Sequence, residues 1–265
     1  MTPVKECADK QILEPCSLNN FTYQVDPYMG CQHYCYYCYV LNSTKFDWTK
    51  EIRIHNDFAG QLEQELDRIE PQKIYMGYNS DPYQPCEKEY QQTRQALQLF
   101  KEKGFSAGIL TKSDLVLRDI DLLQEMDDAS VSLSAAFLDN QVREQFEADT
   151  IDTNIRIEAL MKLKEAGIKT SALLCPVIPH ITDVYELIDK LAPCTDVIWI
   201  YALSILDKSE TSWINLRNIL KIHYPHKYDE IESAVFSKDH PYWTELRDEL
   251  YNTKNDQKLN LNIHV

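Results

Sequence analysis

The stretch MGCQHYCYYCYV, residues 29–40, concentrates three cysteines in one short loop and decides how the rest of the chain is interpreted. Cys31, Cys35 and Cys38 follow the spacing C-x3-C-x2-C, and no fourth cysteine stands close enough to complete a set of four ligands. Closely spaced thiolates are typical ligands of zinc and of iron–sulfur clusters. The loop therefore predicts a metal centre with three protein ligands and one open position.

An iron–sulfur cluster explains the spacing of these cysteines better than a zinc site does. A structural zinc site takes four ligands, usually as two close pairs, so zinc would need His33, His55 or Cys16 in addition to the loop. A cubane cluster fits better, because three thiolates leave one iron free to chelate a small molecule. Three unligated core cysteines are a further alternative, but the polar and aromatic neighbours in the loop disfavour plain burial.

The bulk composition is that of an acidic globular protein. The chain has 265 residues, of which 44% are apolar and 26% charged, and its net charge is −15. Such a charge disfavours broad binding to phosphate backbones. There is no apolar run long enough to cross a membrane, and residues 1–16 lack the apolar core of a signal peptide. We therefore expect a cytoplasmic protein without a membrane partner.

Short β-rich runs alternate with amphipathic helical stretches along most of the chain. The expected strands are 21–28, 73–78, 105–111, 129–137, 168–178 and 195–203, and the expected helices between them are 57–70, 89–104, 115–128, 153–167 and 183–193. This alternation indicates an α/β fold with a parallel sheet, although the periodicity does not separate an open sheet from a barrel. The cysteine loop follows the first strand, and functional sites of parallel α/β folds lie at that edge of the sheet.

Three regions follow from this pattern. Residues 1–20 are expected to form an N-terminal extension, 21–205 the α/β core, and 206–265 a helical C-terminal extension. The extension contains helical patterns at 211–224 and 241–254. Its tail, LNLNIHV, fits either an edge strand or a disordered segment.

The cysteine spacing, with an aromatic residue at Tyr37 before the third cysteine, resembles the radical S-adenosylmethionine (SAM) superfamily. The resemblance implies a partial (β/α)6 barrel and a [4Fe–4S] cluster whose open iron binds SAM. It also implies reductive cleavage of SAM to a 5′-deoxyadenosyl radical, which abstracts hydrogen from a substrate. An electron donor such as flavodoxin or ferredoxin would be a partner.

Further motifs narrow the resemblance. In order, the chain carries VDPYMGCQHYCYYCYV, SDPYQPCEKEYQQTRQAL, ILTKSDLVLRDIDLL, VSLSAAFLD, RIEALMKLKEAGI and PVIPHITDVYEL. These motifs, which cover about residues 21–205, resemble the spore photoproduct lyase-like branch, including proteins called DNA-repair photolyase-like. The branch implies lyase-like chemistry on a substrate that the motifs do not identify.

The resemblance also implies roles for individual residues. The ammonium of Lys112 suits the carboxylate of SAM, although a solvated surface lysine is the plain alternative. Asp81 would partner a hydroxyl or amino group, or simply form the turn before a proline. The implied cofactor-binding set is Tyr37, Ser80, Asp81, Lys112 and Ser134, and the implied cluster ligands are Cys31, Cys35 and Cys38.

One departure concerns the hydrogen donor. In the register of spore photoproduct lyase, Tyr78 occupies the position of the donor cysteine, so Cys86 would have to reach back to replace it. Tyr39 matches a tyrosine of a radical relay, or packs without such a role. The missing cysteine and the negative charge both speak against repair of a thymine dimer, because a flipped base needs basic contacts to phosphate.

Three functions remain as alternatives. The leading one is a radical SAM enzyme with an unassigned substrate; the others are nucleic-acid lesion repair and a non-catalytic, metal-stabilised binding module. Trp199, Tyr201 and Tyr75 either line a substrate cavity or pack in the core. His180 stands at the end of an expected strand, where a site residue or an ordinary loop histidine are both reasonable.

Overall fold

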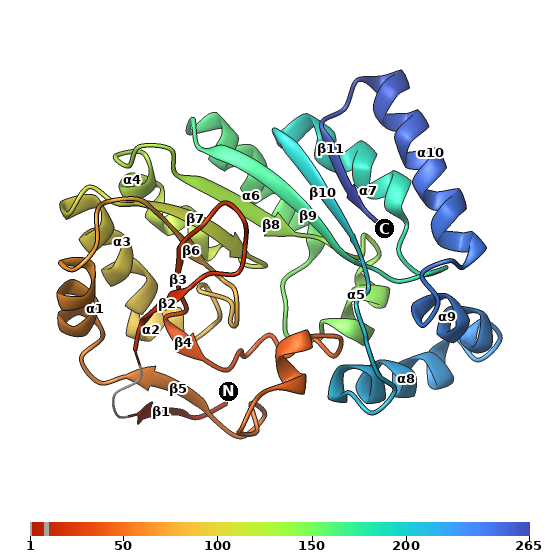
Figure 1. Ribbon diagram of the computed structural model, residues 1–265, viewed down its shortest axis with the longest axis horizontal. Coiled ribbons are helices and arrows are strands. Elements are labelled where there is room, and N and C mark those ends of the chain that lie inside the picture. The colour runs from red at the N-terminus through yellow and green to blue at the C-terminus, as the bar shows by residue number, and fades with distance from the viewer. Residues whose placement is uncertain (1, 8–10) are drawn as a thin grey trace.

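The computed structural model describes residues 2–7 and 11–265 and is built around one eight-stranded sheet. Along the sheet the strands are β11 (Leu261–His264), β10 (Val197–Ala202), β9 (Lys169–Val177), β8 (Ser130–Ser134), β7 (Ser106–Thr111), β6 (Lys73–Met76), β3 (Tyr23–Val25) and β2 (Leu13–Pro15). All neighbours pair in parallel except β2 and β3. The sheet ends at β11 and β2, so its described strands form an open, partial barrel (Figure 1).

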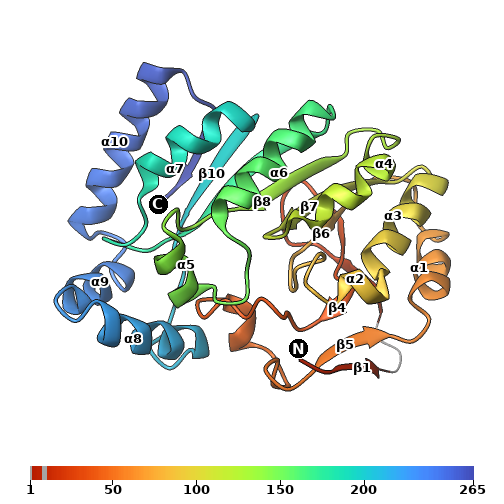
Figure 2. The same ribbon diagram turned by 180° about the vertical axis from the view of Figure 1, so that it is seen from behind.

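Helices cover one face of this sheet (Figure 2). They are α1 (Phe58–Leu66), α3 (Gln92–Glu102), α4 (Ile120–Leu123), α6 (Thr153–Glu165) and α7 (Val184–Leu191). The core lies between the two layers, because the strand residues that face the helices are apolar and at most 2% exposed: Ile74, Ile109, Val131, Ala172 and Ile198. The expected β–α alternation is therefore confirmed.

Aspartates begin three of the long helices. Asp57, Asp152 and Asp183 accept hydrogen bonds from backbone N–H groups in the first turns of α1, α6 and α7. These groups have no partner within the helix, so a capping carboxylate stabilises each start by about 1 kcal/mol. Gly104 and Gly167 follow the ends of α3 and α6 with φ of 75° and 79°, as a C-terminal cap requires.

Two expected helices differ from the structure. The helix expected over 89–104 is interrupted at Gln91, which has φ 51° and separates α2 (Glu87–Tyr90) from α3. The carboxylate of Glu87 accepts hydrogen bonds from the N–H groups of Thr93 and Arg94, so it caps α3 from the preceding turn. The helix expected over 115–128 is a 3-10 segment, η2 (Asp114–Asp119), followed by the short α4.

The strand expected over 21–28 is also divided. Asp26 turns away from β3 to accept hydrogen bonds from Asn79, and Pro27 has no N–H for a ladder. The chain then forms β4 (Tyr28–Met29) in a second sheet with β5 (Ile52–His55) and β1 (Val4–Cys7), which the sequence pattern did not predict. This small sheet leads directly into the cysteine loop.

The C-terminal segment is helical and returns to the main sheet. It contains α8 (Thr211–His223), the unexpected α9 (Tyr228–Val235) and α10 (Pro241–Gln257). The tail then forms β11 parallel to β10, with Tyr201 opposite His264, which settles the tail as an edge strand. Within the described residues, no helix is both long enough and apolar enough to span a bilayer.

Candidate active site at the cysteine loop

A tight turn at Gly30 introduces the cysteine loop. Gly30 has φ 86°, and a Cβ at this position would lie 3.1 Å from side-chain atoms of both Ile52 and Trp48. Glycine is therefore required for both the turn and the close approach. The amide of Gln84 donates to the Gly30 carbonyl (3.0 Å) and accepts from the N–H of Gln32 (2.8 Å). These bonds tie the loop to the segment that follows β6.

The three loop cysteines are free thiols, and Cys31 and Cys38 pack against an apolar cluster of Val40, Leu41 and Trp48. Burial raises the pKa of Cys31 to about 12 and also raises the pKa values of Cys35 and Cys38. Backbone hydrogen bonds oppose this effect. They come from Asp81 and His33 at Cys31, and from Val40 and Leu41 at Cys38.

The donor set of this loop fits an iron–sulfur cluster. Thiolate ligands, hydrogen bonds to the sulfurs and a surrounding apolar layer are the features that proteins use to hold and tune such clusters. In residues 2–7 and 11–265, no three His, Cys, Asp or Glu side chains are grouped to hold a metal ion. In a cubane cluster each of the three thiolates would bind a different iron.

Asp81 forms a buried hub beside the loop. Its carboxylate accepts hydrogen bonds from the Thr111 hydroxyl (2.6 Å) and from the N–H groups of Lys112 (2.7 Å) and Tyr83 (2.8 Å). Nδ1 of His33 lies 3.2 Å from Oδ2. Burial alone would raise the pKa of Asp81, but His33 and these hydrogen bonds outweigh it and hold the pKa at about 2. Asp81 thus joins the ends of β6 and β7 to the cysteine loop.

Lys112 extends from the end of β7 toward the same loop. Its ammonium donates to the Ser134 hydroxyl (2.7 Å), lies 3.6 Å from a carboxylate oxygen of Glu147, and stands 5.9 Å from the centre of the Tyr37 ring. Burial lowers the pKa of Lys112, but Glu147 and Cys35 outweigh this effect and the net pKa is raised. The structure therefore brings Lys112, Ser134 and Tyr37 together.

Glu147 and Arg156 complete this network, and sequence reasoning missed both. Glu147 follows α5 (Asn140–Phe146), is fully buried, accepts a hydrogen bond from the Tyr37 hydroxyl and pairs with Arg156 at 2.8 Å. Arg156 is also fully buried, and it donates to the Ser134 carbonyl (2.8 Å). A charged residue on the apolar face of α6 was a usable signal for Arg156, whereas nothing in the local pattern marks Glu147.

Ser80 and Cys86 are placed differently from the residues around Lys112. The Ser80 hydroxyl donates to the Tyr28 carbonyl at 2.8 Å, so it braces the strand before the loop. Cys86 is 4% exposed and packs with Tyr28, Ile52 and Ile54 at the start of α2. The structure thus buries Cys86 in an apolar cluster. Its expected role as a hydrogen donor stays a prediction.

Tyr39 and Tyr78 form a pair on the outer side of the loop. The Tyr39 hydroxyl donates to the Tyr78 carbonyl at 2.5 Å, and the two rings meet edge-on with centroids 6.2 Å apart. The Tyr78 hydroxyl lies 2.6 Å from the hydroxyl of Ser17. Tyr39 remains 52% exposed. The structure thus brings these two residues together, and their catalytic roles stay predictions.

A row of aromatic rings lies on the sheet face that the helices do not cover. Ile198 and Ile200 face the core, so alternation directs Trp199 and Tyr201 to the other face, where both are half-buried. Tyr201 stacks on His264 of β11 with centroids 4.5 Å apart and rings parallel within 5°. The ring of Trp199 is parallel to that of Tyr201 within 9°. These rings are therefore not part of the helix-side core.

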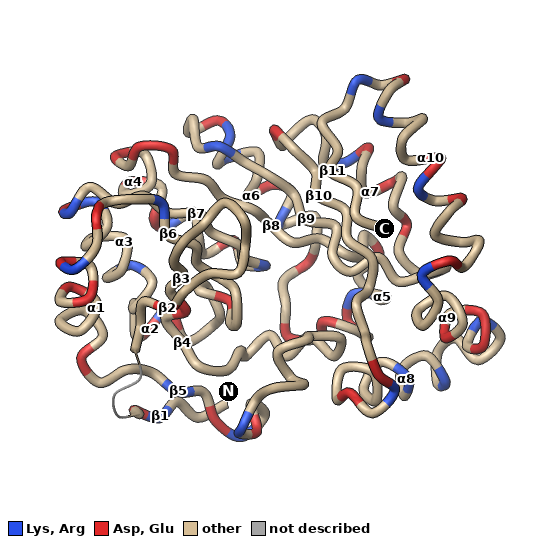
Figure 3. The backbone as a smooth tube through the Cα atoms, in the orientation of Figure 1, with Lys and Arg blue, Asp and Glu red and all other residues tan. Residues whose placement is uncertain are grey.

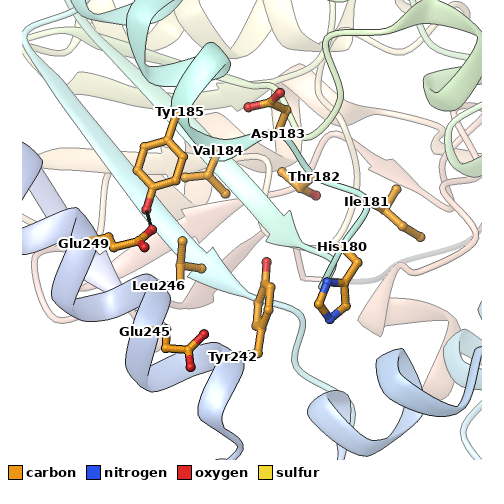
Figure 4. A pocket seen from close by; sticks show the side chains of 10 residues that line it. All are labelled: His180, Ile181, Thr182, Asp183, Val184, Tyr185, Tyr242, Glu245, Leu246 and Glu249. Carbon is orange, nitrogen blue, oxygen red and sulfur yellow. Dashed lines mark hydrogen bonds between the residues drawn. The ribbon is translucent and has the colours of Figure 1, made fainter. Parts of the chain in front are cut away.

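Two cavities lie outside this network. One, of about 420 Å³, opens between the start of α7 and α10 (Figure 4). His180 lines it beside Tyr242, with Nε2 3.1 Å from Glu230, so this strand-end histidine is not brought to the cysteine loop. The other, of about 410 Å³, borders the cysteine loop at Tyr34, Leu41 and Trp48.

Charges of both signs are interleaved over the fold (Figure 3). Several basic side chains are already paired with carboxylates, for example Lys5 and Arg53 with Glu51, and Lys50 with Asp47. With a net charge of −15, such pairing leaves little positive charge to attract phosphates.

Comparisons with known proteins concern the family and the fold of this chain. A family model described as the radical SAM superfamily matches residues 25–191. The "Uncharacterized protein MJ0683" of Methanocaldococcus jannaschii is 30% identical over 233 residues, which are 86% of each chain. Relatives from Mycobacterium tuberculosis and Mycobacterium bovis are 28% identical, and this chain spans only 54% of their length.

Two further matches carry names that describe a function. The "Radical SAM Nalpha-GlyT isomerase" of Pseudomonas phage M6 is 25% identical over 173 residues, covering 63% of this chain and 36% of that protein. A spore photoproduct lyase variant with bound AdoMet and a dinucleoside spore photoproduct shares the fold, with TM-score 0.71 and 16% identity. That match covers 97% of this chain and 80% of the lyase.

Proposed function

The chain belongs to the radical SAM superfamily, whose members use a [4Fe–4S] cluster and SAM, and from this premise we propose that it is an enzyme that abstracts hydrogen from its substrate. When bound, the cluster and SAM supply a 5′-deoxyadenosyl radical. Cys31, Cys35 and Cys38 would hold the cluster. An electron donor such as flavodoxin or ferredoxin is the partner that this chemistry needs.

The observation that carries the proposal is the half-buried position of Lys112 beside the cysteine loop. Its side chain is 15% exposed, and its ammonium is held by Ser134 and Glu147. A half-buried lysine in this position suits a small anionic group such as the carboxylate of SAM. Ser134 orients Lys112, so the expected contact of Ser134 with SAM is proposed to act through this ammonium. The backbone of Tyr37 remains the candidate contact for adenine.

The uncovered face of the sheet is our candidate for the substrate side. Trp199, Tyr201 and His264 present flat rings there. Cys175 lies on β9, the strand beside β10, and its carbonyl accepts a hydrogen bond from the Ser134 hydroxyl (3.5 Å), which itself accepts from Lys112. This chain of neighbours links the aromatic rings to the proposed SAM site.

Nucleic-acid lesion repair is the second candidate function. The fold shared with spore photoproduct lyase, which was solved with a dinucleoside photoproduct, favours it. The net charge of −15, the interleaved charges and Tyr78 at the position of the donor cysteine all argue against it. A non-catalytic, metal-stabilised module is the third candidate, and it would give Lys112 no role in SAM cleavage.

Anaerobic reconstitution tests the proposal. We expect roughly four irons and four sulfides per chain, and formation of 5′-deoxyadenosine when SAM and dithionite are added. Lys112→Ala should retain iron but lose most of the 5′-deoxyadenosine. A reconstituted protein that binds iron and leaves SAM intact would refute the enzymatic proposal. Gel retardation of a thymine-dimer oligonucleotide would favour lesion repair.

A further inference from the structure

The carboxylate of Glu147 contacts both the ammonium of Lys112 and the cysteine loop, the latter through the hydroxyl of Tyr37. Its side chain is 0% exposed, and its two oxygens are divided between partners. Oε1 accepts from the Tyr37 hydroxyl and lies 3.6 Å from the Lys112 ammonium, whereas Oε2 pairs with Arg156 at 2.8 Å. A buried carboxylate persists only when such partners compensate its desolvation.

The backbone of Glu147 is fixed as firmly as its side chain. The Glu147 carbonyl accepts from the Arg143 guanidinium (2.8 Å) and from the Thr150 hydroxyl (2.8 Å). The preceding Phe146 is fully buried and stacks on Phe137 with centroids 4.9 Å apart. Glu147 is therefore a rigid point from which other groups can be positioned.

Two bonds connect this rigid point to the cysteine loop. The N–H of Tyr36 donates to the Phe146 carbonyl (3.0 Å), and the hydroxyl of Tyr37 donates to Glu147. Both tyrosines lie between Cys35 and Cys38. The part of the loop that carries these two cysteines is thus attached to Glu147, which contacts Lys112, and to Phe146, the residue before it.

The charges of Lys112, Arg156 and Glu147 leave one positive charge available to bind an anionic ligand. Lys112 and Arg156 are positive and Glu147 is negative, so the three side chains carry one net positive charge in a buried site. Arg156 is fully enclosed, whereas Lys112 keeps 15% exposure. The uncompensated charge is therefore presented at Lys112, where one carboxylate would neutralise it.

We propose that Glu147 is a positioning residue that couples the two halves of the site: it holds the Lys112 ammonium for a ligand carboxylate and fixes the cysteine loop through Tyr37. The identity of the ligand as SAM rests on the proposed function, but the attachment of the loop does not.

SAM binding to the reconstituted, unreduced protein tests whether Glu147 positions the Lys112 ammonium. If only charge mattered, Glu147→Gln would remove a nearby negative charge and strengthen the binding of an anionic ligand. If Glu147 positions Lys112, the same change weakens SAM binding, because the Lys112 ammonium loses one of its two partners. We expect the dissociation constant of SAM to rise roughly five- to thirtyfold, with unchanged iron content. Unchanged or tighter SAM binding would overturn the positioning role.

Hydrogen exchange of the full-length protein without iron or SAM tests whether Glu147 fixes the cysteine loop. Glu147→Ala should speed the exchange of amides in residues 35–38, and Glu147→Gln, which keeps an acceptor for Tyr37, should restore most of the protection. Equal exchange in all variants would overturn the attachment. Glu158→Gln and Glu158→Ala are the matched controls, because Glu158 is exposed on the same helix as Arg156. Should Glu147→Ala fail to fold, Tyr37→Phe removes the same bond.

These outcomes separate the inference from the proposed function. If the wild-type protein neither assembles a cluster nor binds SAM, the proposed function fails, and the exchange experiment still decides whether Glu147 fixes the loop. If the wild type binds SAM and the Glu147 variants match Glu158→Gln in both measurements, the enzyme proposal stands and this inference fails.

Discussion

Replacement of Asp81 by asparagine tests the buried hub that joins the strand ends to the cysteine loop. Each carboxylate oxygen faces a backbone donor: Oδ1 faces the N–H of Tyr83 at 2.8 Å, and Oδ2 faces the N–H of Lys112 at 2.7 Å. An amide has a single acceptor oxygen, so either orientation of asparagine turns its NH2 group against one of these donors. The change keeps the volume of the side chain but leaves one of the two backbone N–H groups without an acceptor.

The magnitude follows from two contributions. The folded-state pKa of about 2 lies below the ordinary value of about 4 for an aspartate, so ionised Asp81 contributes about 2 to 3 kcal/mol at neutral pH. A buried N–H left without an acceptor costs a further 1 to 3 kcal/mol or so. We therefore expect Asp81→Asn to reduce the free energy of unfolding by about 3 to 6 kcal/mol.

The pH dependence has a definite sign. Because the folded-state pKa is depressed, the stabilisation by Asp81 is complete above the unfolded-state value near pH 4 and is lost as the pH falls through about 2. Asparagine does not titrate. The difference between wild type and Asp81→Asn should therefore be constant above about pH 5 and shrink toward pH 2.

Urea denaturation of the metal-free protein, followed by circular dichroism at several pH values, measures both quantities. Asp127→Asn is the control, because Asp127 is exposed and the change should stay within about 0.5 kcal/mol. If Asp81→Asn destabilises no more than this control at pH 7, or if its effect persists unchanged at pH 3 and below, the hub does not act as described.

Three shorter predictions concern other parts of the site. Lys112→Ala should weaken SAM binding, measured by equilibrium dialysis, without loss of iron. Gly77→Ala should lower the thermal midpoint far more than Gly167→Ala, because its Cβ would lie 2.2 Å from the Leu110 carbonyl oxygen whereas Gly167 has no atom within 4 Å. Trp199→Phe should remove most of the fluorescence that acrylamide quenches, because the three other tryptophans are at most 4% exposed; unchanged quenching would contradict its placement on the uncovered face.

Local pattern was sufficient for most of the main sheet and its helices. Strands buried on one face by helices are apolar at alternate positions, as at Ile74 and Ile109, and the helices carry aspartate at their starts and glycine after their ends. The cysteine loop was predictable because its three cysteines are close together in the sequence. The resemblance of residues 21–205 to the radical SAM family then implied that Lys112 and Ser134 belong to the same site.

Contacts between side chains that lie far apart in the sequence could not be predicted from the local sequence pattern. The break at Gln91 depends on Glu87 capping the next helix, which no periodicity expresses. Glu147 lies 110 residues from Tyr37 in sequence and meets it only in the folded chain. The second sheet consists of strands of at most four residues, too short for a periodic pattern.

The pairing of β10 with β11 has a consequence for biosynthesis. A ribosome that has completed β10 must add about 60 more residues before β11 emerges, which takes roughly 3 to 12 seconds at typical elongation rates. During that interval the nascent chain exposes the unpaired edge of β10, a surface on which other strands can aggregate. A chain truncated after residue 258 should therefore give less soluble protein than the full chain, and co-expression of the segment 259–265 as a separate peptide should restore part of the yield.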